Sequence, residues 1–402
     1  MSLEKPPSIT RNEFEQRRKQ AAEDASARGL DALLVWSVGG SRVDSFADVF
    51  YLTNHYSTES RCHDVRPLMT GFGHAAVVVP VDGEPALLVH KPDWRTDLVA
   101  IDEVESDHDL YRLVVASLRA KGLERARIGL VREDFVPLPL YRELCEEFPE
   151  AEFVSGGDVL EHRRMVKSPA EIKHMRHASA VSVEIMNAMF AAAEVGNTDG
   201  DLATIGFKRA TELGATPWDF AMASGPHSTH VWWGRLPSFD AKRKYAKGDI
   251  IHPDVYGCVD GYFYDFVRSI IVGRSPTDDQ LALVEAGISL IHHVCEQIGP
   301  GVRASDIYES SIAWIGEQGW LDESSGVTPT MTPLPFLAHG IGLGWEGPWI
   351  SADNETTFEP GMTVAVETTL SLNGEGSGYE ETVLVTDDGY EIMTAACPAR
   401  WW

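Results

Sequence analysis

Two aspartates, Asp254 and Asp265, are the residues whose spacing first suggests chemistry. The segment between them, 257–261, is rich in glycine; two isoleucines precede Asp254, and an aromatic run, 262–267, surrounds Asp265. These runs predict two antiparallel strands joined by a turn, with Asp254 closing the first strand. Pairing would bring both carboxylates onto one face, where they repel unless a cation lies between them. Two solvated turn residues are the alternative for such a pair taken alone.

Further metal-ligand candidates follow in the C-terminal part of the chain. His339 stands beside a Gly-x-Gly run, Glu367 ends a predicted strand, and Glu380 or Glu381 begins the next one, so that all are expected at strand ends or turns. Gathering these carboxylates and an imidazole in a cleft is costly unless metal neutralises them. Oxygen ligands with a single histidine favour Mn²⁺, Fe²⁺, Co²⁺ or Zn²⁺, and bridging carboxylates could hold a pair of ions that activates a shared water.

Composition places these groups in a globular protein of 402 residues, of which 44% are hydrophobic. The net charge of −27 argues against nucleic acid and anionic membrane as partners, because both require basic patches. No apolar run approaches the roughly 18 residues of a membrane span, and the first 19 residues have no apolar core typical of a signal peptide. Five scattered cysteines without C-x-x-C spacing predict reduced thiols. We therefore expect a cytoplasmic protein.

Two domains are predicted to position the candidates. Strands alternate with helices in the first half, and the strands are expected near 31–36, 75–80, 85–89 and 127–131. Ser168, Pro169 and Glu171 then form a near-ideal helix start with a capping box. Further helices are expected among antiparallel strands, over about 199–213, 277–298 and 304–318. The fold class is α+β, with an N-terminal domain over 1–160, a linker over 161–167 and a catalytic domain over 168–402.

The motifs of the second half resemble those of the pita-bread metallopeptidases, which include methionine aminopeptidase, prolidase, Xaa-Pro aminopeptidase and creatinase. The matching stretches are 254–268 (D-x-G-x4-G-Y-x2-D-x-T-R), 339–342 (H-G-x-G), 360–367 (P-G-M-x4-E) and 380–386 (E-D-x-V-L-V-T). Tyr256 and Val267 replace the usual glycine and threonine of the first stretch, and Glu381 replaces the usual aspartate of the last. The resemblance implies a pita-bread catalytic domain that binds two divalent metal ions through Asp254, Asp265, His339, Glu367 and Glu380.

The first half resembles the N-terminal domain of the creatinase and prolidase branch, with Tyr51-Leu52-Thr53 as a weak marker. This branch implies a homodimer that acts on a small molecule or dipeptide and hydrolyses a C–N bond with a metal-bridging hydroxide. Glu367 would be both ligand and proton shuttle. Segment 55–66, with Arg61 and His63, would reach the partner's cleft and contact an anionic substrate group; a solvated loop is the alternative.

Departures from the family pattern concern the substrate. The positions of two substrate-contacting histidines hold Trp232 and Glu346, and His230 lies two residues before the first of them. His230 and Glu346 are therefore catalytic candidates, although Glu346 could instead pair with an arginine such as Arg235. Trp232 and Trp345 could form an aromatic pocket for a cationic ligand, unless they pack in the core.

Three functions remain open. The favoured one is an Xaa-Pro peptidase-like metallohydrolase. The second is a non-peptidase of the same fold: an amidinohydrolase, a small-amide hydrolase or a lyase, because the S-G-P turn and the H-G-x-G-x-x-x-E-x-P arrangement resemble dimethylsulfoniopropionate lyase. The third is a metal-free binding module, which the presence of every ligand position disfavours.

Overall fold

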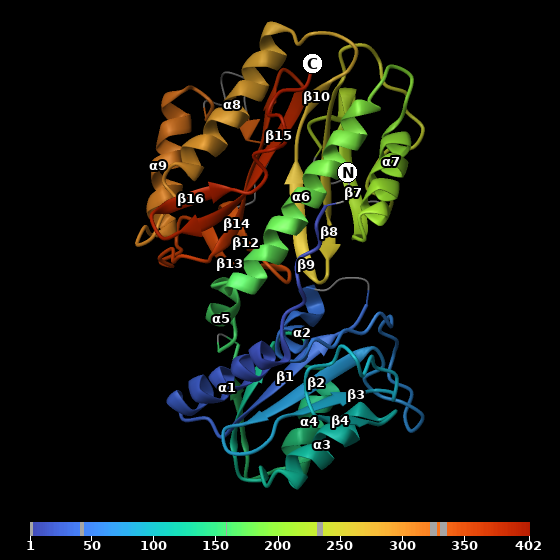
Figure 1. Ribbon diagram of the computed structural model, residues 1–402, viewed down its shortest axis with the longest axis vertical. Coiled ribbons are helices and arrows are strands. Elements are labelled where there is room, and N and C mark those ends of the chain that lie inside the picture. Colours follow the sequence, from blue (N-terminus) through green and yellow to red (C-terminus); the bar gives the residue numbers. More distant parts are fainter. Residues whose placement is uncertain (1–2, 41–43, 158, 231–235, 322–327, 330–335) are drawn as a thin grey trace. The chain divides into compact units, whose positions relative to one another are not determined.

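The computed structural model describes residues 3–40, 44–157, 159–230, 236–321, 328–329 and 336–402 (Figure 1). The chain forms two compact units, one over Ser8–Arg164 and the other over Met165–Trp402 together with Met1–Pro7. The stretch predicted as a linker, 161–167, contains the short helix α5 (Glu161–Met165). Both units combine helices and sheets, which confirms the predicted α+β class.

The N-terminal unit is built on one mixed six-stranded sheet of order β4-β3-β2-β1-β5-β6. The predicted hairpin is present, since β2 and β3 pair antiparallel, and β5 runs parallel to β1. Residues on both faces of β1 are buried, as expected for a strand covered by helices on each side. The strands are β1 (Ala32–Val38), β2 (His74–Pro80), β3 (Ala86–Val89), β4 (Glu103–Ser106), β5 (Arg127–Val131) and β6 (Glu152–Ser155). The helices are α1 (Arg11–Ala27), α2 (Ala47–Thr53), α3 (Leu110–Ala120) and α4 (Leu138–Glu147).

The second unit contains two antiparallel sheets. One has the order β10-β8-β7, with β9 also paired to β8; the other has the order β13-β12-β14-β15-β16, with β11 paired to β14. The strands of the first sheet are β7 (Thr216–Ser224), β8 (Ile250–Val259), β9 (Tyr262–Val267) and β10 (Ile270–Ile271). Those of the second are β11 (Thr328–Pro329), β12 (Phe336–Ile341), β13 (Trp345–Ser351), β14 (Thr363–Leu372), β15 (Glu375–Thr386) and β16 (Gly389–Ile392).

Four helices flank these sheets: α6 (Pro169–Ala191), α7 (Asp199–Glu212), α8 (Asp278–Cys295) and α9 (Ala304–Glu317). Helix α6 contacts β8 and β9, whereas α8 contacts β14 and β15 (Figure 1). The predicted capping box is present, because Ser168 Oγ accepts from the backbone N–H of Glu171 and a Glu171 carboxylate oxygen accepts from that of Ser168. Within the described ranges, every helix is too short or too polar to cross a membrane.

A polar seam joins the two sheets of this unit where β9 ends beside β15. The Ser269 hydroxyl lies 3.0 Å from both the backbone nitrogen and the carbonyl oxygen of Gly378. The fully buried guanidinium of Arg268 donates to Glu381 Oε1 at 2.7 Å. These contacts hold β9 against β15, which is the arrangement that brings the predicted ligands of the two sheets together.

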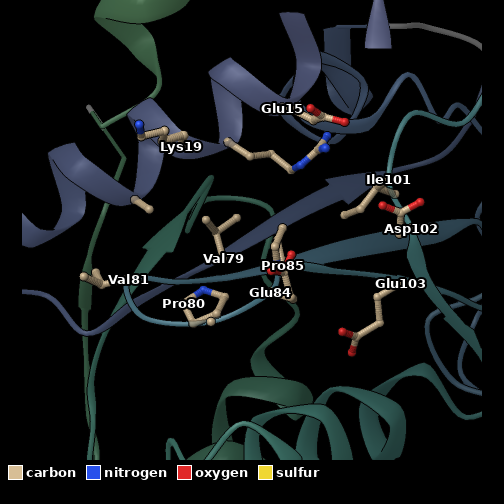
Figure 2. A pocket seen from close by; sticks show the side chains of 13 residues that line it. Glu15, Lys19, Val79, Pro80, Val81, Glu84, Pro85, Ile101, Asp102 and Glu103 are labelled. Carbon is tan, nitrogen blue, oxygen red and sulfur yellow. The ribbon is translucent and has the colours of Figure 1, made fainter. Parts of the chain in front are cut away.

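A hollow of about 800 Å³ lies in the N-terminal unit beside α1 and the end of β2 (Figure 2). Charged residues around it include Glu15, Lys19, Glu84 and Asp102. Its buried arginine, Arg18, donates to the carbonyl oxygen of Leu52 at 2.6 Å, near the end of α2. The hollow contains none of the residues predicted for the active site.

Candidate metal centre

The β8–β9 hairpin places Asp254 and Asp265 on one face of the sheet. Asp254 pairs with Val267, and Tyr256 with Asp265, so the two aspartates are diagonal neighbours. Asp260 and Gly261, with φ of 51° and 88°, form a two-residue turn in which both positions require the left-handed region. The predicted turn over 257–261 was therefore too long. Strand β8 runs to Val259, and Asp254 lies inside it rather than at its end.

The other three candidates lie on neighbouring strands of the second sheet. His339 of β12 pairs with Ala365 of β14, and Glu367 of β14 pairs directly with Glu380 of β15. Because opposed residues share a face and alternate residues along a strand return to it, these three side chains point the same way. All lie inside strands, which corrects the expectation of strand ends and turns.

These side chains converge in a buried cluster. His339 Nε2 lies 3.7 Å from Asp265 Oδ2 and 3.6 Å from Glu367 Oε1. One ligand atom each from Asp265, His339 and Glu380 lie within 4.8 Å of one another. His339 and Glu380 have no exposed surface, and Asp254 is 7% exposed. The structure thus brings together Asp265, His339, Glu367 and Glu380, from strands β9, β12, β14 and β15.

Burial and mutual repulsion shift the titration of this cluster. Burial, followed by the charge of Asp265, raises the pKa of Glu367 to about 8. Burial also raises the pKa of Glu380 well above its ordinary value, and the charges of Asp265, Glu367 and Asp254 add to the effect. Burial lowers the pKa of His339. A set of carboxylates that resists ionisation in this way is stabilised by a cation.

The hydrogen bonds of the cluster fit a divalent cation. Across the described part of the chain, neither carboxylate oxygen of Glu380 nor Nε2 of His339 has a hydrogen-bond partner. His339 Nδ1 lies 3.0 Å from the carbonyl oxygen of Gly340, to which it donates, so the lone pair of Nε2 faces the carboxylates. Buried polar atoms without partners are rare, and here they are those that a metal would use.

The adjacent residue, Glu381, has the opposite environment. Its carboxylate accepts from Arg268 and from the Tyr379 hydroxyl, each at 2.7 Å, and from Thr394 Oγ1. Consecutive residues of a strand point to opposite faces, so only one of the two glutamates can reach the cluster. The geometry favours Glu380, in agreement with the family resemblance.

Close packing explains both glycines of the H-G-x-G stretch. A Cβ atom at Gly340 would lie 1.9 Å from the carbonyl oxygen of Gly347 on β13. At Gly342 it would lie 2.2 Å from Glu346 Oε1 and 2.9 Å from Lys167 Cε. The glycines thus allow β13 and a buried ion pair to approach the strand that carries His339.

Trp345, predicted to contact substrate, borders the cluster directly. Its indole nitrogen donates to Asp265 Oδ2 at 2.8 Å, and its ring centroid lies 4.8 Å from that of His339. The side chain is 40% exposed, so one surface remains open to solvent. The bond to Asp265 was not predicted from the sequence. The second predicted tryptophan, Trp232, lies outside the described residues.

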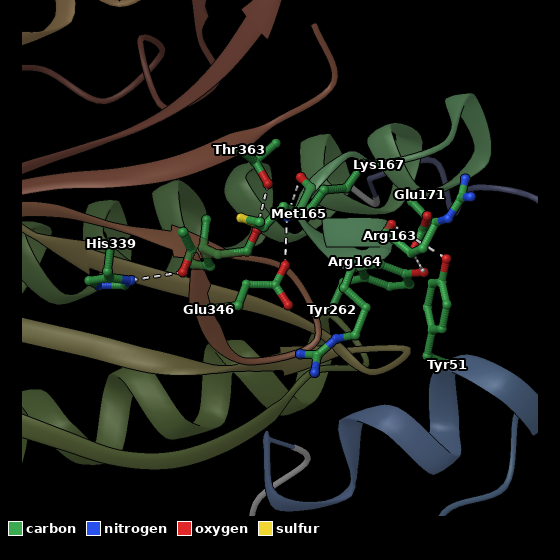
Figure 3. Close-up of polar contacts among 12 residues, drawn as sticks. Tyr51, Arg163, Arg164, Met165, Lys167, Glu171, Tyr262, His339, Glu346 and Thr363 are labelled. Atoms are coloured by element: carbon green, nitrogen blue, oxygen red, sulfur yellow. Dashed lines mark hydrogen bonds and ion pairs between the residues drawn. The ribbon is translucent and has the colours of Figure 1, made fainter. Parts of the chain in front are cut away.

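Glu346 forms an ion pair that sequence reasoning missed. Its Oε1 lies 2.6 Å from Lys167 Nζ, and both side chains are almost completely buried (Figure 3). The proposed alternative partner, Arg235, is outside the described residues. Because Lys167 neutralises it, Glu346 adds no uncompensated charge to the cluster. The only sequence signal was a lysine directly before the helix cap.

The remaining candidates lie outside the cluster. His230 is exposed, and its Nδ1 lies 3.4 Å from the hydroxyl oxygen of the preceding Thr229. Arg61 and His63 are exposed residues of the N-terminal unit. Their predicted roles in substrate contact therefore stay predictions.

Comparison with known proteins matches both units to characterised families. The sequence pattern of metallopeptidase family M24 matches residues 173–387. The pattern of the creatinase/prolidase N-terminal domain matches residues 17–166.

Individual relatives match this chain at modest identity. A probable dipeptidase PepE of Mycobacterium tuberculosis is 27% identical over 340 residues, covering 80% of this chain and 84% of its own. The dimethylsulfoniopropionate lyase DddP of Roseobacter denitrificans is 29% identical over 263 residues, covering 60% of this chain and 55% of its own. The crystal structure of a prolidase from Pyrococcus horikoshii has a TM-score of 0.75 at 21% identity, covering 94% of this chain and 98% of its own.

Proposed function

We propose that this chain, which belongs to metallopeptidase family M24, is a metal-dependent hydrolase of the creatinase/prolidase branch that cleaves a C–N bond in a small substrate. The observation that carries the proposal is the buried cluster of Asp265, His339, Glu367 and Glu380, in which the Glu380 oxygens lack protein partners among the described residues. Xaa-Pro dipeptides are the first substrates to test, since PepE is named a probable dipeptidase.

Asp254, Asp265, His339, Glu367 and Glu380 would hold two divalent cations, drawn from Mn²⁺, Fe²⁺, Co²⁺ and Zn²⁺. Bound cations of this kind lower the pKa of water and polarise a substrate carbonyl. As the family resemblance implies, Glu367 would be both a ligand and the group that accepts and returns a proton. The Gly340 carbonyl keeps the His339 ring oriented, and Trp345 does the same for the Asp265 carboxylate.

A non-peptidase reaction is the second candidate. The exposed part of Trp345 would present an aromatic face beside the cluster, where a cationic or methylated substrate group could bind. The lyase relative supports this reading at 29% identity. Trp232, His230, Arg61 and His63 are further proposed substrate contacts, the latter two from a partner subunit of a homodimer. The ion pair with Lys167 makes Glu346 a positioning group in this proposal rather than a base.

The test is a substrate panel on metal-reconstituted protein. Xaa-Pro dipeptides, creatine, small amides and dimethylsulfoniopropionate should be compared with and without chelator, alongside Asp265→Asn. We expect chelation and Asp265→Asn to abolish turnover, and the variant to lose bound metal. Asp260→Asn is the matched control, because it lies in the same hairpin and asparagine tolerates the left-handed turn. Full metal content and turnover in Asp265→Asn would refute the site.

A further inference from the structure

The segment that opens α6, residues 167–171, contacts β13, β9 and the turn that leads into β14. Lys167 Nζ bonds to Glu346 of β13, and the Lys167 backbone nitrogen donates to the carbonyl oxygen of Gly361 at 3.0 Å, just before β14. At the other end of the segment, Glu171 Oε1 accepts from the Tyr262 hydroxyl of β9 at 3.0 Å. Figure 3 shows the contacts of Lys167 with Glu346 and of Glu171 with Tyr262. Strands β9 and β14 carry Asp265 and Glu367, so the segment touches the supports of two candidate ligands.

Lys167 is held inside the protein together with its ion-pair partner. Its side chain is 1% exposed, that of Glu346 is 6% exposed, and Nζ also donates to the Met165 carbonyl oxygen at 3.1 Å. Ion pairs so deeply buried contribute little net stability, since desolvation offsets their attraction. Their better attested contribution is to fix one arrangement of the surrounding chain.

What the pair fixes is the β12–β13 hairpin. Glu346 pairs with Gly340 across the hairpin, and its carboxylate fills the space beside Gly342. The preceding residue is Trp345, whose indole donates to Asp265 Oδ2 and packs against His339. A shift of Glu346 would therefore move the indole and change the orientation of the Asp265 carboxylate.

We infer that Lys167 is a positioning residue for the metal centre, acting through Glu346 and Trp345 on Asp265. The inference rests on the proposed metal-dependent function. Lys167 itself touches none of the candidate ligands in the contacts described, so its effect is on how strongly and in what geometry the ions are bound. Residues that orient metal ligands typically affect metal affinity by about 10- to 100-fold.

The experiment measures metal binding rather than turnover. In Lys167→Met, we expect the Kd for Co²⁺ to rise at least about 10-fold and the visible absorption spectrum of the bound Co²⁺ to change, with far-UV circular dichroism unchanged. Arg176→Met is the matched control, because it removes an exposed ion pair with Glu391 from α6, the helix that follows Lys167. The control should keep the wild-type Kd and spectrum.

A second variant covers the case in which an unpaired Glu346 prevents folding. Lys167→Met combined with Glu346→Leu removes both charges and leaves no buried ion without a partner. This double variant should fold and should show the same weakened binding and altered spectrum. Wild-type Kd and spectrum in either folded variant would overturn the role of Lys167 while leaving the proposed function intact. Absence of Co²⁺ binding by the wild-type protein would overturn both.

Discussion

Each unit buries a cluster of titratable side chains, and the two clusters differ in how the cost of a buried charge is avoided. In the N-terminal unit, His55, His74 and His90 are each at least nine-tenths buried. Burial lowers the pKa of all three, to about 4 for His55 and for His74. Imidazoles become neutral above these values, so this cluster needs no counter-ion at neutral pH. Trp36 Nε1 donates to His74 Nδ1 at 3.0 Å, as suits a neutral ring.

The carboxylates of the second unit become neutral only by keeping a proton, and burial accordingly raises the pKa of Glu367 to about 8 and that of Glu380 well above its ordinary value. Glu380 is neutral only if it keeps its proton at a pH well above its ordinary pKa. Within the described ranges, its oxygens have no hydrogen-bond partner that would stabilise the protonated form. The comparison teaches that burial of titratable groups alone does not identify a metal site. Several acids buried together, with neither carboxylate oxygen of Glu380 hydrogen-bonded within the described ranges, are what favours a metal site here.

The largest expected effect comes from Glu380→Gln. Removing this ligand should lower turnover by more than the about 100-fold typical of groups that only orient ligands, and should reduce bound metal. Glu381→Asp is the matched comparison, since it keeps a carboxylate on the opposite face beside Arg268. Metal analysis and kinetics of both proteins make the test; equal metal loss in the two would remove the distinction between the faces.

A second effect concerns the metal-free protein. The pKa of Glu367 is raised to about 8 in the folded state, so its contribution to stability is complete below its unfolded pKa and is lost as pH rises toward 8. We expect the chelated protein to lose up to about 1.4 kcal/mol of unfolding free energy per pH unit over this window. Denaturant unfolding at several pH values measures it. Added metal should remove the trend, and an unchanged slope with metal would contradict the explanation.

The histidine cluster should show the opposite trend. Since the folded pKa values of His55 and His74 are lowered to about 4, stability is complete above about pH 6.5 and is lost as pH falls toward 4. The loss should reach about 1.4 kcal/mol per pH unit for each histidine. His55→Leu should reduce this slope, whereas the same change at exposed His63 should leave it unaltered. Unfolding monitored in the N-terminal unit provides the measurement.

The smallest effect is expected in amide hydrogen exchange, which compares the strands around the two clusters directly. Chelation should increase amide hydrogen exchange in β12, β14 and β15, which carry candidate ligands, because those strands lose their cation. Exchange in β1 and β2 beside the histidine cluster should change little. Equal increases of exchange in both units would show that the stabilising effect of the ion extends beyond the strands that hold it.

Much of the framework could be predicted from the sequence. Helices α7, α8 and α9 were expected within about three residues of their observed ends, because capping residues and Gly-Pro breaks are local signals. The strands of the first half were also predicted closely, but the same local reading failed for the strand that carries Asp254. The glycine-rich segment 257–261 suggested that the first strand ends at Asp254, but pairing on both sides by β7 and β9 carries β8 through to Val259.

The contacts that orient the candidate ligands were beyond sequence reasoning. Lys167 and Glu346 are 179 positions apart, and Trp345 and Asp265 are 80 positions apart. Such contacts follow from the packing of strands against each other, for which local spacing carries no signal. Likewise, a physical reason to choose Glu380 over Glu381 came only from the structure, in which Arg268 pairs with Glu381.

The short turn at Asp260 and Gly261 limits how this protein can vary in length. Surface loops usually tolerate insertions and deletions, since their ends need only remain connected. Here, adding or removing one residue in the turn would slip the pairing by one position and send Asp265 to the opposite face of the sheet. We expect functional relatives to keep this exposed loop at one length even where its residue types differ.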